Sequence, residues 1–306
     1  MRRRAVGLLD NVKGEARPQP FVEDTAVPPE NLADFIQEFR ALLDSYDLQY
    51  GMFGHVDAGV LHVRPILNMK DPTQAALIRP ISDAAALTQK HGGLLWGEHG
   101  KGLRSQYVPD YFGELYPALQ QLKAAFDPWN QLSPGKIATP NSLPDTHLSR
   151  VDEVTLRGEL DRTIDERVWR SYDTTLHCNG NGACYNFDPD DAMCPSWKSN
   201  RDRVHSPKGR ASFIREWLRL QGQQHIDALA ASDHLRSNSN VASLAKRAVN
   251  TVSQKMGQRD FSHEVYEAMA ECLACKSCAG QCPVKVTCLN SAHVCWSCIT
   301  AAICVL

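Results

Sequence analysis

The first clear element of the chain is an amphipathic helix that is expected to begin near Glu30. Apolar residues recur there every three or four positions, at Leu32, Phe35, Ile36, Phe39 and Leu42. That spacing places them on one face of a helix. A helix with such a stripe needs another element to cover it, and the next segments predict a sheet.

Two apolar runs, residues 49–56 and 60–67, predict the strands of an antiparallel hairpin. A tight turn at Ala58-Gly59 would place His55 directly opposite His62. Directly opposed residues hold their Cβ atoms about 4.5–5.5 Å apart. We therefore expect the two imidazoles to project side by side from one face of the sheet.

Helical and extended patterns then alternate. Helix, helix, short strand and amphipathic helix are expected over 71–78, 80–91, 94–97 and 110–126. Pro117 either kinks the last helix or marks its true start. The residues expected to face inward from it are Phe112, Leu115, Leu119, Leu122 and Phe126. Together these elements predict an α+β domain over residues 1–137.

A segment rich in Pro, Ser, Thr and Asn begins at Ala138 and predicts a linker over 138–170. The domain that follows, 171–286, is expected to be mainly α-helical between its cysteines. One of its helices should open at Ser206-Pro207, and another should cover 262–271.

Composition narrows the class of protein. The chain has 306 residues, 11 Cys, a net charge of -2 and 43% hydrophobic residues, so it can form buried cores and lacks the basic excess typical of nucleic-acid binding. No apolar stretch reaches the ~18 residues of a membrane span, and no signal peptide follows the basic start. The cysteines have metal-type spacings, which favours a reducing compartment. We expect a cytoplasmic protein, with a peripheral position at the inner membrane face left open.

One cysteine pattern carries the strongest chemical signal. It reads C-x2-C-x2-C-x3-C-P, the ligand run of a bacterial-type iron–sulfur cluster, and consists of Cys272, Cys275, Cys278 and Cys282. Structural zinc is the alternative, but zinc normally takes two separated C-x2-C pairs. In two-cluster ferredoxins the cysteine before the proline ligates the other cluster. A partner half-motif does lie upstream, at Cys178, Cys184 and Cys194.

His55, His62 and Glu98 form a second candidate site. Two imidazoles and one carboxylate suit zinc, manganese or iron with open coordination positions. His99 is then a candidate general base beside the metal. Without further support, ordinary structural histidines explain this pattern better.

Three motifs together resemble the C-terminal domain of FAD-linked oxidases, the vanillyl-alcohol-oxidase-like group. They are GHVDAGVLH at 54–62, GEHGKG at 97–102, and FDP with PGK within 126–136. FVEDTAVP at 21–28 and CNGNGAC at 178–184 further resemble the large bacterial D-2-hydroxyglutarate dehydrogenase type, which fuses FAD domains to an iron–sulfur domain. The resemblance extends from about residue 4 to residue 286.

The resemblance implies roles for the histidine group. His55, His62 and Glu98 would hold a divalent metal, zinc or manganese, that grips the carboxylate and hydroxyl oxygens of a small 2-hydroxy acid. His99 would take the hydroxyl proton while hydride leaves the same carbon for the flavin.

Arg64 and Lys136 would contact substrate or cofactor. Arg64 stands where some relatives carry Asn, and Ser133 stands where relatives usually carry Asn before Pro-Gly-Lys. These departures leave the contacts at both positions open.

Asn181 leaves the number of clusters open, because it takes the middle ligand position between Cys178 and Cys184. With Cys282 reaching across, that cluster would have three thiolates, which suits a 3Fe–4S centre or a fourth ligand other than Cys. Alternatively this half holds no cluster and contributes only Cys194, as the fourth ligand of the C-x2-C-x2-C run. We expect at least that one complete 4Fe–4S set.

Both ends depart from the family pattern. The family's FAD-binding domain precedes everything seen here, so most of the flavin site is expected to be missing. The last 20 residues contain no complete ligand set in their four cysteines, Cys288, Cys295, Cys298 and Cys304. Back-translated and read one base earlier, the tail gives the amphipathic helix expected after the cluster motif. We interpret 287–306 as an aberrant, frameshifted tail, with a membrane anchor or a third metal site as rival interpretations.

The sequence therefore predicts a fragment of a flavin- and iron–sulfur-dependent dehydrogenase acting on a D-2-hydroxy acid of the 2-hydroxyglutarate or lactate type. Electrons would pass through FAD to a 4Fe–4S cluster and on to an unidentified acceptor, and the fragment alone would be inactive. The alternatives are an iron–sulfur electron-transfer subunit that partners a separate FAD-domain chain, and the inactive product of a decayed gene. Neither a nucleic-acid partner nor an integral membrane segment is expected.

Overall fold

The computed structural model describes residues 14–144, 147–237, 245, 248–249, 251–253, 256–257 and 261–288. The chain divides into two compact bodies between Glu159 and Leu160. That division lies within the predicted linker. The boundaries predicted at 137 and 171 stay predictions.

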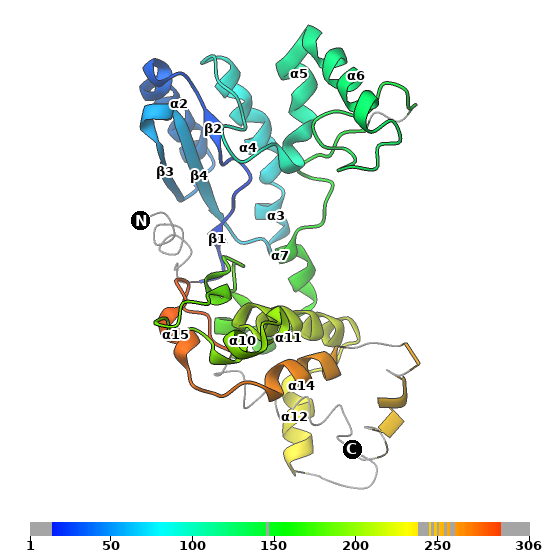
Figure 1. Ribbon diagram of the computed structural model, residues 1–306. Coiled ribbons are helices and arrows are strands. Elements are labelled where there is room, and N and C mark those ends of the chain that lie inside the picture. The colour runs from blue at the N-terminus through cyan, green and yellow to red at the C-terminus, as the bar shows by residue number, and fades with distance from the viewer. Residues whose placement is uncertain are drawn as a thin grey trace. The chain divides into compact units, whose positions relative to one another are not determined.

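The first body is built on a small antiparallel sheet whose central strand is β4 (Val60–Leu67). β3 (Tyr50–His55) pairs with one edge of β4. β1 (Arg17–Pro18) and β2 (Thr25–Ala26) pair with the other edge at opposite ends of the strand (Figure 1). Beyond β2, the strand predicted over 94–97 is reduced to a single antiparallel bridge between Leu94 and Ala26.

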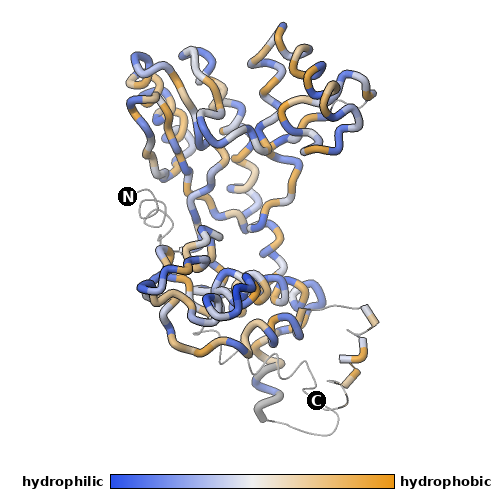
Figure 2. Tube along the Cα trace, viewed as in Figure 1, coloured by the Kyte–Doolittle hydropathy of each residue, from blue (hydrophilic) through white to orange (hydrophobic). Residues whose placement is uncertain are grey.

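Side chains alternate along β4, so Leu61 and Val63 point to one face and His62 to the other. α2 (Leu32–Ser45) covers the apolar face of the sheet, as its predicted stripe requires (Figure 1). Of the residues predicted for that stripe, Phe35 and Phe39 are fully buried, and Leu43, which the prediction did not include, is fully buried beside them. Figure 2 shows the corresponding mixture of hydrophobic and hydrophilic residues along the strands and helices of both bodies.

The hairpin register predicted from the sequence is wrong by two residues. His62 pairs with Phe53, and His55 pairs with Val60. The strands are joined by a 3-10 turn over Val56–Ala58 closed by Gly59 at φ 67°, which is a longer connection than the turn expected at Ala58-Gly59. A shift of two residues leaves every side chain on its original face. The two histidines therefore share a face as diagonal neighbours rather than as a directly opposed pair.

The other helices of this body are short. They are α3 (Pro72–Ala75), α4 (Ile78–Ala84), α5 (Val108–Phe112), α6 (Tyr116–Phe126) and α7 (Arg157–Leu160), the last ending in the second body. The helix predicted over 110–126 is divided because Gly113, at φ 49°, ends α5 and Pro117 lies in the first turn of α6.

The prediction that this region buries its apolar residues is wrong for three of them. Leu115, Leu122 and Phe126 are 66%, 57% and 80% exposed. Periodicity identifies an apolar face but does not say which element covers it. In the described part of the chain, no element covers this face of α6.

The second body is mainly helical and is organised around α11 (Pro207–Gln223) (Figure 1). Ser206 caps this helix, because its Oγ accepts a hydrogen bond from the N–H of Gly209 at 3.0 Å. α11 packs against α9 (Asp173–Leu176) and α14 (Ser262–Ala270). Its core residues are Ile214, Trp217 and Leu218, all buried. The remaining helices are α8 (Glu166–Ser171), α10 (Pro195–Asn200), α12 (Ala228–Ser237) and α15 (Ser277–Gln281).

A sheet covered by helices, followed by a mainly helical body, confirms the predicted α+β fold class. Among the described residues, no helix combines the length and the apolar character needed to cross a membrane.

Candidate functional site

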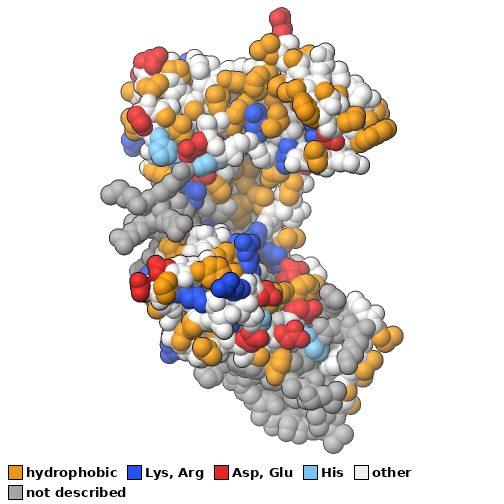
Figure 3. Space-filling view, in the orientation of Figure 1, with side chains coloured by type: hydrophobic (Ala, Val, Ile, Leu, Met, Phe, Trp, Pro, Cys, Tyr) orange, Lys and Arg blue, Asp and Glu red, His pale blue; other side chains and the backbone are white. Residues whose placement is uncertain are grey.

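One carboxylate oxygen gathers three imidazoles on the polar face of the sheet. Oε1 of Glu98 lies 2.9 Å from Nε2 of His62, 3.3 Å from Nε2 of His99 and 3.5 Å from Nε2 of His55. The side chain of His62 is 1% exposed, whereas those of His55 and His99 are 44% and 40% exposed. The group is thus anchored in the sheet and open to solvent, and Figure 3 shows histidine side chains beside acidic ones on the surface of this body.

The sheet fixes the orientation of the central imidazole. His62 lies within β4, and the ring of its cross-strand partner Phe53 is 5.1 Å away between centroids. The ring of His99 stacks on that of His62 at 4.8 Å and 13°. The ring of His55 approaches edge-on at 5.8 Å and 89°. Packing from three directions leaves Nε2 of His62 aimed at Glu98.

Sequence reasoning missed Asp24, which holds the segment that carries Glu98 and His99. Asp24 is fully buried at a left-handed φ of 75°. Its carboxylate accepts hydrogen bonds from the backbone N–H groups of Glu98 (3.0 Å) and His99 (2.8 Å). Its carbonyl accepts another from Gly97 (2.7 Å). The available signal was an acidic pair, Glu23-Asp24, within an otherwise apolar and small-residue stretch.

The donor set fits a divalent cation. Asp24, His62, Glu98 and His99 each offer a ligand atom, and these atoms lie within 4.8 Å of one another. His55 belongs to the same neighbourhood through its 3.5 Å approach to Glu98. Imidazole nitrogens and carboxylate oxygens are ligands that zinc and manganese accept.

Arg64 lies beside this group, held by an ion pair. Its Nε donates to Oε2 of Glu23 at 2.6 Å, and the two side chains are only 16% and 14% exposed. The other oxygen of Glu23 lies 3.5 Å from Nδ1 of His99. Glu23 therefore links the guanidinium of Arg64 to the imidazole of His99.

The structure does not bring Lys136 into this group. Its backbone N–H donates to the carbonyl of Ser133 at 3.2 Å, and its side chain makes no contact with the histidines among the described residues. Ser133 adopts φ 49°, a left-handed conformation that Asn tolerates better than most residues. This is a backbone reason for the Asn that the family pattern places there.

Four cysteines of the second body line one small pocket. They are Cys194, Cys272, Cys275 and Cys278, the set predicted to be a complete 4Fe–4S ligand set. Cys194 immediately precedes α10, Cys272 and Cys275 lie between α14 and α15, and Cys278 lies in the first turn of α15. Left-handed residues turn the backbone around this pocket, with φ 41° at Cys194, 52° at Ala274 and 60° at Lys276.

The remaining predicted cluster ligands do not line this pocket. Cys184 is buried in a cluster with Cys194, and Cys282 packs against that cluster. Cys178 packs against the core around α11. The side chain of Asn181 is used inside its own loop, where Oδ1 accepts from the N–H two residues later at 2.8 Å.

Known protein families match both bodies. The model for FAD linked oxidases, C-terminal domain, matches residues 1–137, and the model for the 4Fe-4S dicluster domain matches residues 174–286. The chain consists of a FAD-linked oxidase C-terminal domain followed by a 4Fe–4S dicluster domain. The histidine–carboxylate group lies in the FAD-oxidase domain, and all seven predicted cluster cysteines lie in the dicluster domain. The resemblance inferred from the motifs is confirmed.

Two relatives match nearly the whole of this chain, across both bodies, and are themselves much longer. A D-2-hydroxyglutarate dehydrogenase of Pseudomonas putida is 71% identical over 287 residues, and one of Escherichia coli is 56% identical over 289 residues. Each match covers 94% of this chain but 28% of the relative, so the chain spans less than a third of these proteins. A D-lactate dehydrogenase of Archaeoglobus fulgidus is 28% identical over 117 residues, covering 38% of this chain and 26% of the relative. No solved structure matches the chain.

Of the four tail cysteines, only Cys288 falls within the described residues, and Cys295, Cys298 and Cys304 lie outside them. Cys288 is 2% exposed in the core of the dicluster domain, with Sγ 3.5 Å from the carbonyl of Pro207. Burial raises the pKa of its thiol well above the usual value, so it packs as a small apolar side chain. The frameshift interpretation of 287–306 stays a prediction.

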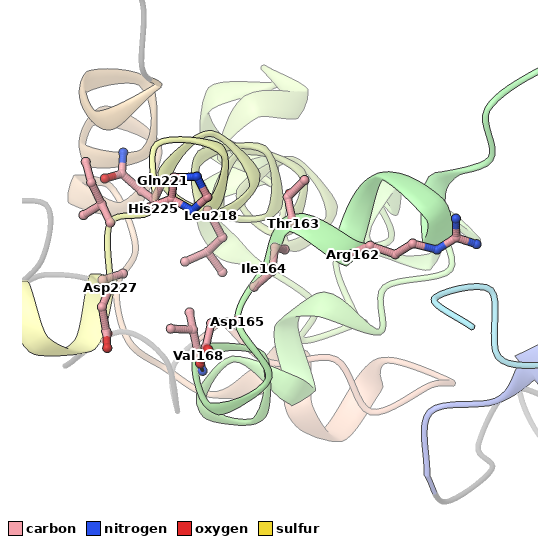
Figure 4. A pocket seen from close by; sticks show the side chains of 12 residues that line it. Arg162, Thr163, Ile164, Asp165, Val168, Leu218, Gln221, His225 and Asp227 are labelled. Atoms are coloured by element: carbon pink, nitrogen blue, oxygen red, sulfur yellow. Dashed lines mark hydrogen bonds between the residues drawn. The ribbon is translucent and has the colours of Figure 1, made fainter. Parts of the chain in front are cut away.

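A pocket of about 320 Å³ in the dicluster domain contains none of the predicted site residues (Figure 4). It lies between the start of α8 and the end of α11. Its two carboxylates already have structural partners: Asp165 caps α8 by accepting from the N–H of Arg167, and Asp227 forms an ion pair with the Arg167 side chain. The pocket is therefore better explained by helix capping than by ligand binding.

Proposed function

We propose that this chain is the substrate-binding and iron–sulfur portion of a flavin-dependent dehydrogenase that oxidises a D-2-hydroxy acid, of the 2-hydroxyglutarate or lactate type. The observation that carries the proposal is the convergence of three imidazole nitrogens on one oxygen of Glu98, on an open face of a FAD-oxidase domain. The printed names of the relatives support this class of substrate. The clustered thiols support a reducing compartment, and we propose the cytoplasm.

In this proposal His55, His62 and Glu98 hold a divalent cation, zinc or manganese. When bound, the cation supplies Lewis-acid polarisation of the substrate hydroxyl and a counter-charge for the substrate carboxylate. Asp24 positions Glu98 and His99 through their backbone N–H groups. The substrate would then bind on the solvent side of His62, where His55 and His99 are exposed.

His99 is the proposed general base. Its Nδ1 lies 3.5 Å from Glu23 and 3.9 Å from Asp24. Two carboxylates on that side favour the tautomer with its proton on Nδ1, and Nε2 is then the nitrogen proposed to accept the hydroxyl proton of the substrate. Hydride from the same carbon would go to the flavin, whose chemistry is that of a hydride acceptor.

The cysteine pocket would hold a 4Fe–4S cluster through Cys194, Cys272, Cys275 and Cys278, because all four thiols line the same pocket. A cluster at this place supplies one-electron transfer from reduced flavin to an acceptor. Cys178, Cys184 and Cys282 stay proposed ligands of a second centre.

The test is isothermal titration of the purified 306-residue chain with manganese, because zinc would also bind the thiols of the cysteine pocket. We expect one site, and we expect His62→Ala or Glu98→Gln to weaken binding at least tenfold, because each removes a proposed ligand. His91→Ala is the matched control, since His91 also pairs with a carboxylate, Glu38, at 3.4 Å but has no place in the group. The metal-site proposal is wrong if His62→Ala and His91→Ala bind the ion equally well.

The substrate class is tested separately, with the chain produced in fusion with the part of the Pseudomonas putida relative that it does not cover. We expect reduction of a dye by D-2-hydroxyglutarate or D-lactate and not by the corresponding L enantiomers. Dye reduction with both enantiomers, or with neither, would contradict the proposed stereochemistry or the proposed substrate class.

A further inference from the structure

A buried arginine lines the cysteine pocket. Arg210 lies in the first turns of α11 and is 3% exposed. Removing a guanidinium from water is costly unless a negative partner or a full set of hydrogen bonds compensates it. Arg210 is therefore expected to have a negatively charged partner nearby.

The hydrogen bonds of Arg210 hold it firmly without neutralising its charge. Its Nε donates to the carbonyl of Ala268 at 2.7 Å, and one terminal nitrogen donates to Oγ of Ser196 at 3.2 Å. The other terminal nitrogen donates to Sγ of Cys194 at 3.6 Å. No carboxylate of the described residues pairs with it.

Arg215, on the same helix, shows how this body treats a buried arginine elsewhere. Arg215 pairs with the fully buried carboxylate of Asp161, with Nε 2.8 Å from Oδ1. Asp161 is also contacted by Arg219 at 2.9 Å. The contrast singles out Arg210 as a buried cation that contacts a thiol and, among the described residues, pairs with no carboxylate.

The four thiols of the pocket can supply the missing negative charge. Arg210 lines the same pocket as these four thiols, and its N–H contact is made with Cys194.

We propose that Arg210 is the built-in counter-cation of the iron–sulfur cluster and raises its reduction potential. This inference rests on the proposal that Cys194, Cys272, Cys275 and Cys278 hold that cluster. On reduction a 4Fe–4S centre with four thiolates gains one electron and passes from a net charge of about -2 to about -3, with no bond broken. A fixed cation and an N–H···S hydrogen bond stabilise the more negative state, because such bonds and local charge set cluster potentials.

The experiment uses the full chain, reconstituted anaerobically with iron and sulfide, and follows the cluster by redox titration with electron paramagnetic resonance. For Arg210→Gln we expect the reduction equilibrium to become at least tenfold less favourable, a lowering of about 59 mV for a one-electron couple. Arg210→Lys keeps the charge but loses the planar fork, so we expect a shift of less than half that size. Arg203→Gln removes an exposed charge that lies over the ring of Tyr185, and we expect less than a threefold change because solvent screens it.

Iron and sulfide content are measured in each variant, which separates tuning from assembly. An Arg210→Gln chain with full iron content and an unchanged potential overturns the inference. If Arg210→Gln assembles no cluster, Arg210→Lys decides. A cluster in the lysine variant supports the need for a buried cation, and its absence would mean that the hydrogen bonds of Arg210, not its charge, are what the site needs.

A failure of the underlying ligand assignment gives a different result. Cys194→Ser would then retain the wild-type spectrum and iron content, whatever Arg210→Gln does. If Arg210→Gln leaves the potential unchanged and Cys194→Ser loses the cluster, the counter-cation inference is wrong and the ligand assignment stands.

Discussion

The histidine–carboxylate group and the cysteine pocket are built in opposite ways. The first is set by backbone pairing: His55 and His62 lie on neighbouring strands, and Glu98 is held by hydrogen bonds from its own segment to Asp24. The second is set by loops at helix ends. The backbone around it takes left-handed values at Cys194 and at two residues of the C-x2-C-x2-C loop.

This difference predicts how much each site depends on its inorganic partner. A sheet hydrogen-bonds its own backbone whether or not an ion is present, so the histidine group should be preorganised. Non-glycine residues in left-handed conformations cost on the order of 1–3 kcal/mol each and persist only where the surroundings enforce them. If the pocket holds the proposed cluster, thiolate–iron bonds would stabilise these conformations.

The largest expected effect is therefore on the dicluster domain. Oxidative loss of the cluster should lower its melting temperature by about 10 °C, because metal bonds contribute directly to folding in such domains. Treatment of the FAD-oxidase domain with a chelator should change its melting by less than about 3 °C. Calorimetry of the whole chain, with the two transitions assigned by selective treatment, measures both. Equal falls in the melting temperatures of the two domains would contradict the proposed difference between the two sites.

The second prediction concerns the turn of the hairpin that carries His55 and His62. Gly59 closes the turn at φ 67°, and a Cβ placed on it would lie 1.8 Å from the carbonyl oxygen of Val27. Gly59→Ala should lower the free energy of unfolding by about 3 kcal/mol or more, since both strain and a backbone clash oppose it. The matched control is Gly100→Ala: Gly100 is at φ 78° with nothing within 4 Å, so only the conformational strain of about 1–2 kcal/mol applies. Denaturant unfolding measures both variants, and similar losses would show that the close approach to Val27 is unimportant.

The third prediction concerns Asp24. Asp24→Ala removes the acceptor of two backbone N–H groups and should cost about 2–3 kcal/mol of stability. Asp24→Asn keeps one acceptor oxygen and should cost less. If Asp24 acts by positioning, Asp24→Asn should also weaken metal binding less than Glu98→Gln does. An Asp24→Asn chain that loses the metal as fully as Glu98→Gln would place Asp24 among the ligands.

The elements and the site were predicted from the sequence to different extents. β4 and the buried stripe of α2 follow directly from local periodicity, so these predictions are confirmed. The register of the hairpin was missed because pattern fixes the face of a side chain but not the length of the connecting turn. The exposure of Phe126 was missed because burial depends on what covers a helix, which its own sequence does not contain.

The same limit applies to the two sites. Cys272, Cys275 and Cys278 could be grouped from spacing alone, since the ligands of a loop are close in sequence. Asp24 acts on residues more than seventy positions away, and no local pattern announces such a contact. Likewise, the sequence around Arg210 predicts only an arginine on a helix, and its burial and its contact with Cys194 are known from the structure alone.

The smallest effect we predict separates His55 from His99, which lie at nearly equal distances from Glu98, 3.5 and 3.3 Å. His55→Ala removes a proposed ligand, so it should weaken metal binding about tenfold, which is a loss of about 1.4 kcal/mol of binding free energy. His99→Ala removes a proposed base and not a ligand, so metal affinity should change by less than about threefold.

The stacking of His99 on His62 and its approach to Glu23 suit either role, because metal-bound histidines also face carboxylates. Titration of both variants with the same ion decides between them. If His99→Ala loses the metal and His55→Ala keeps it, the coordination shell is His62, Glu98 and His99, and the proton acceptor must be sought elsewhere on the open face.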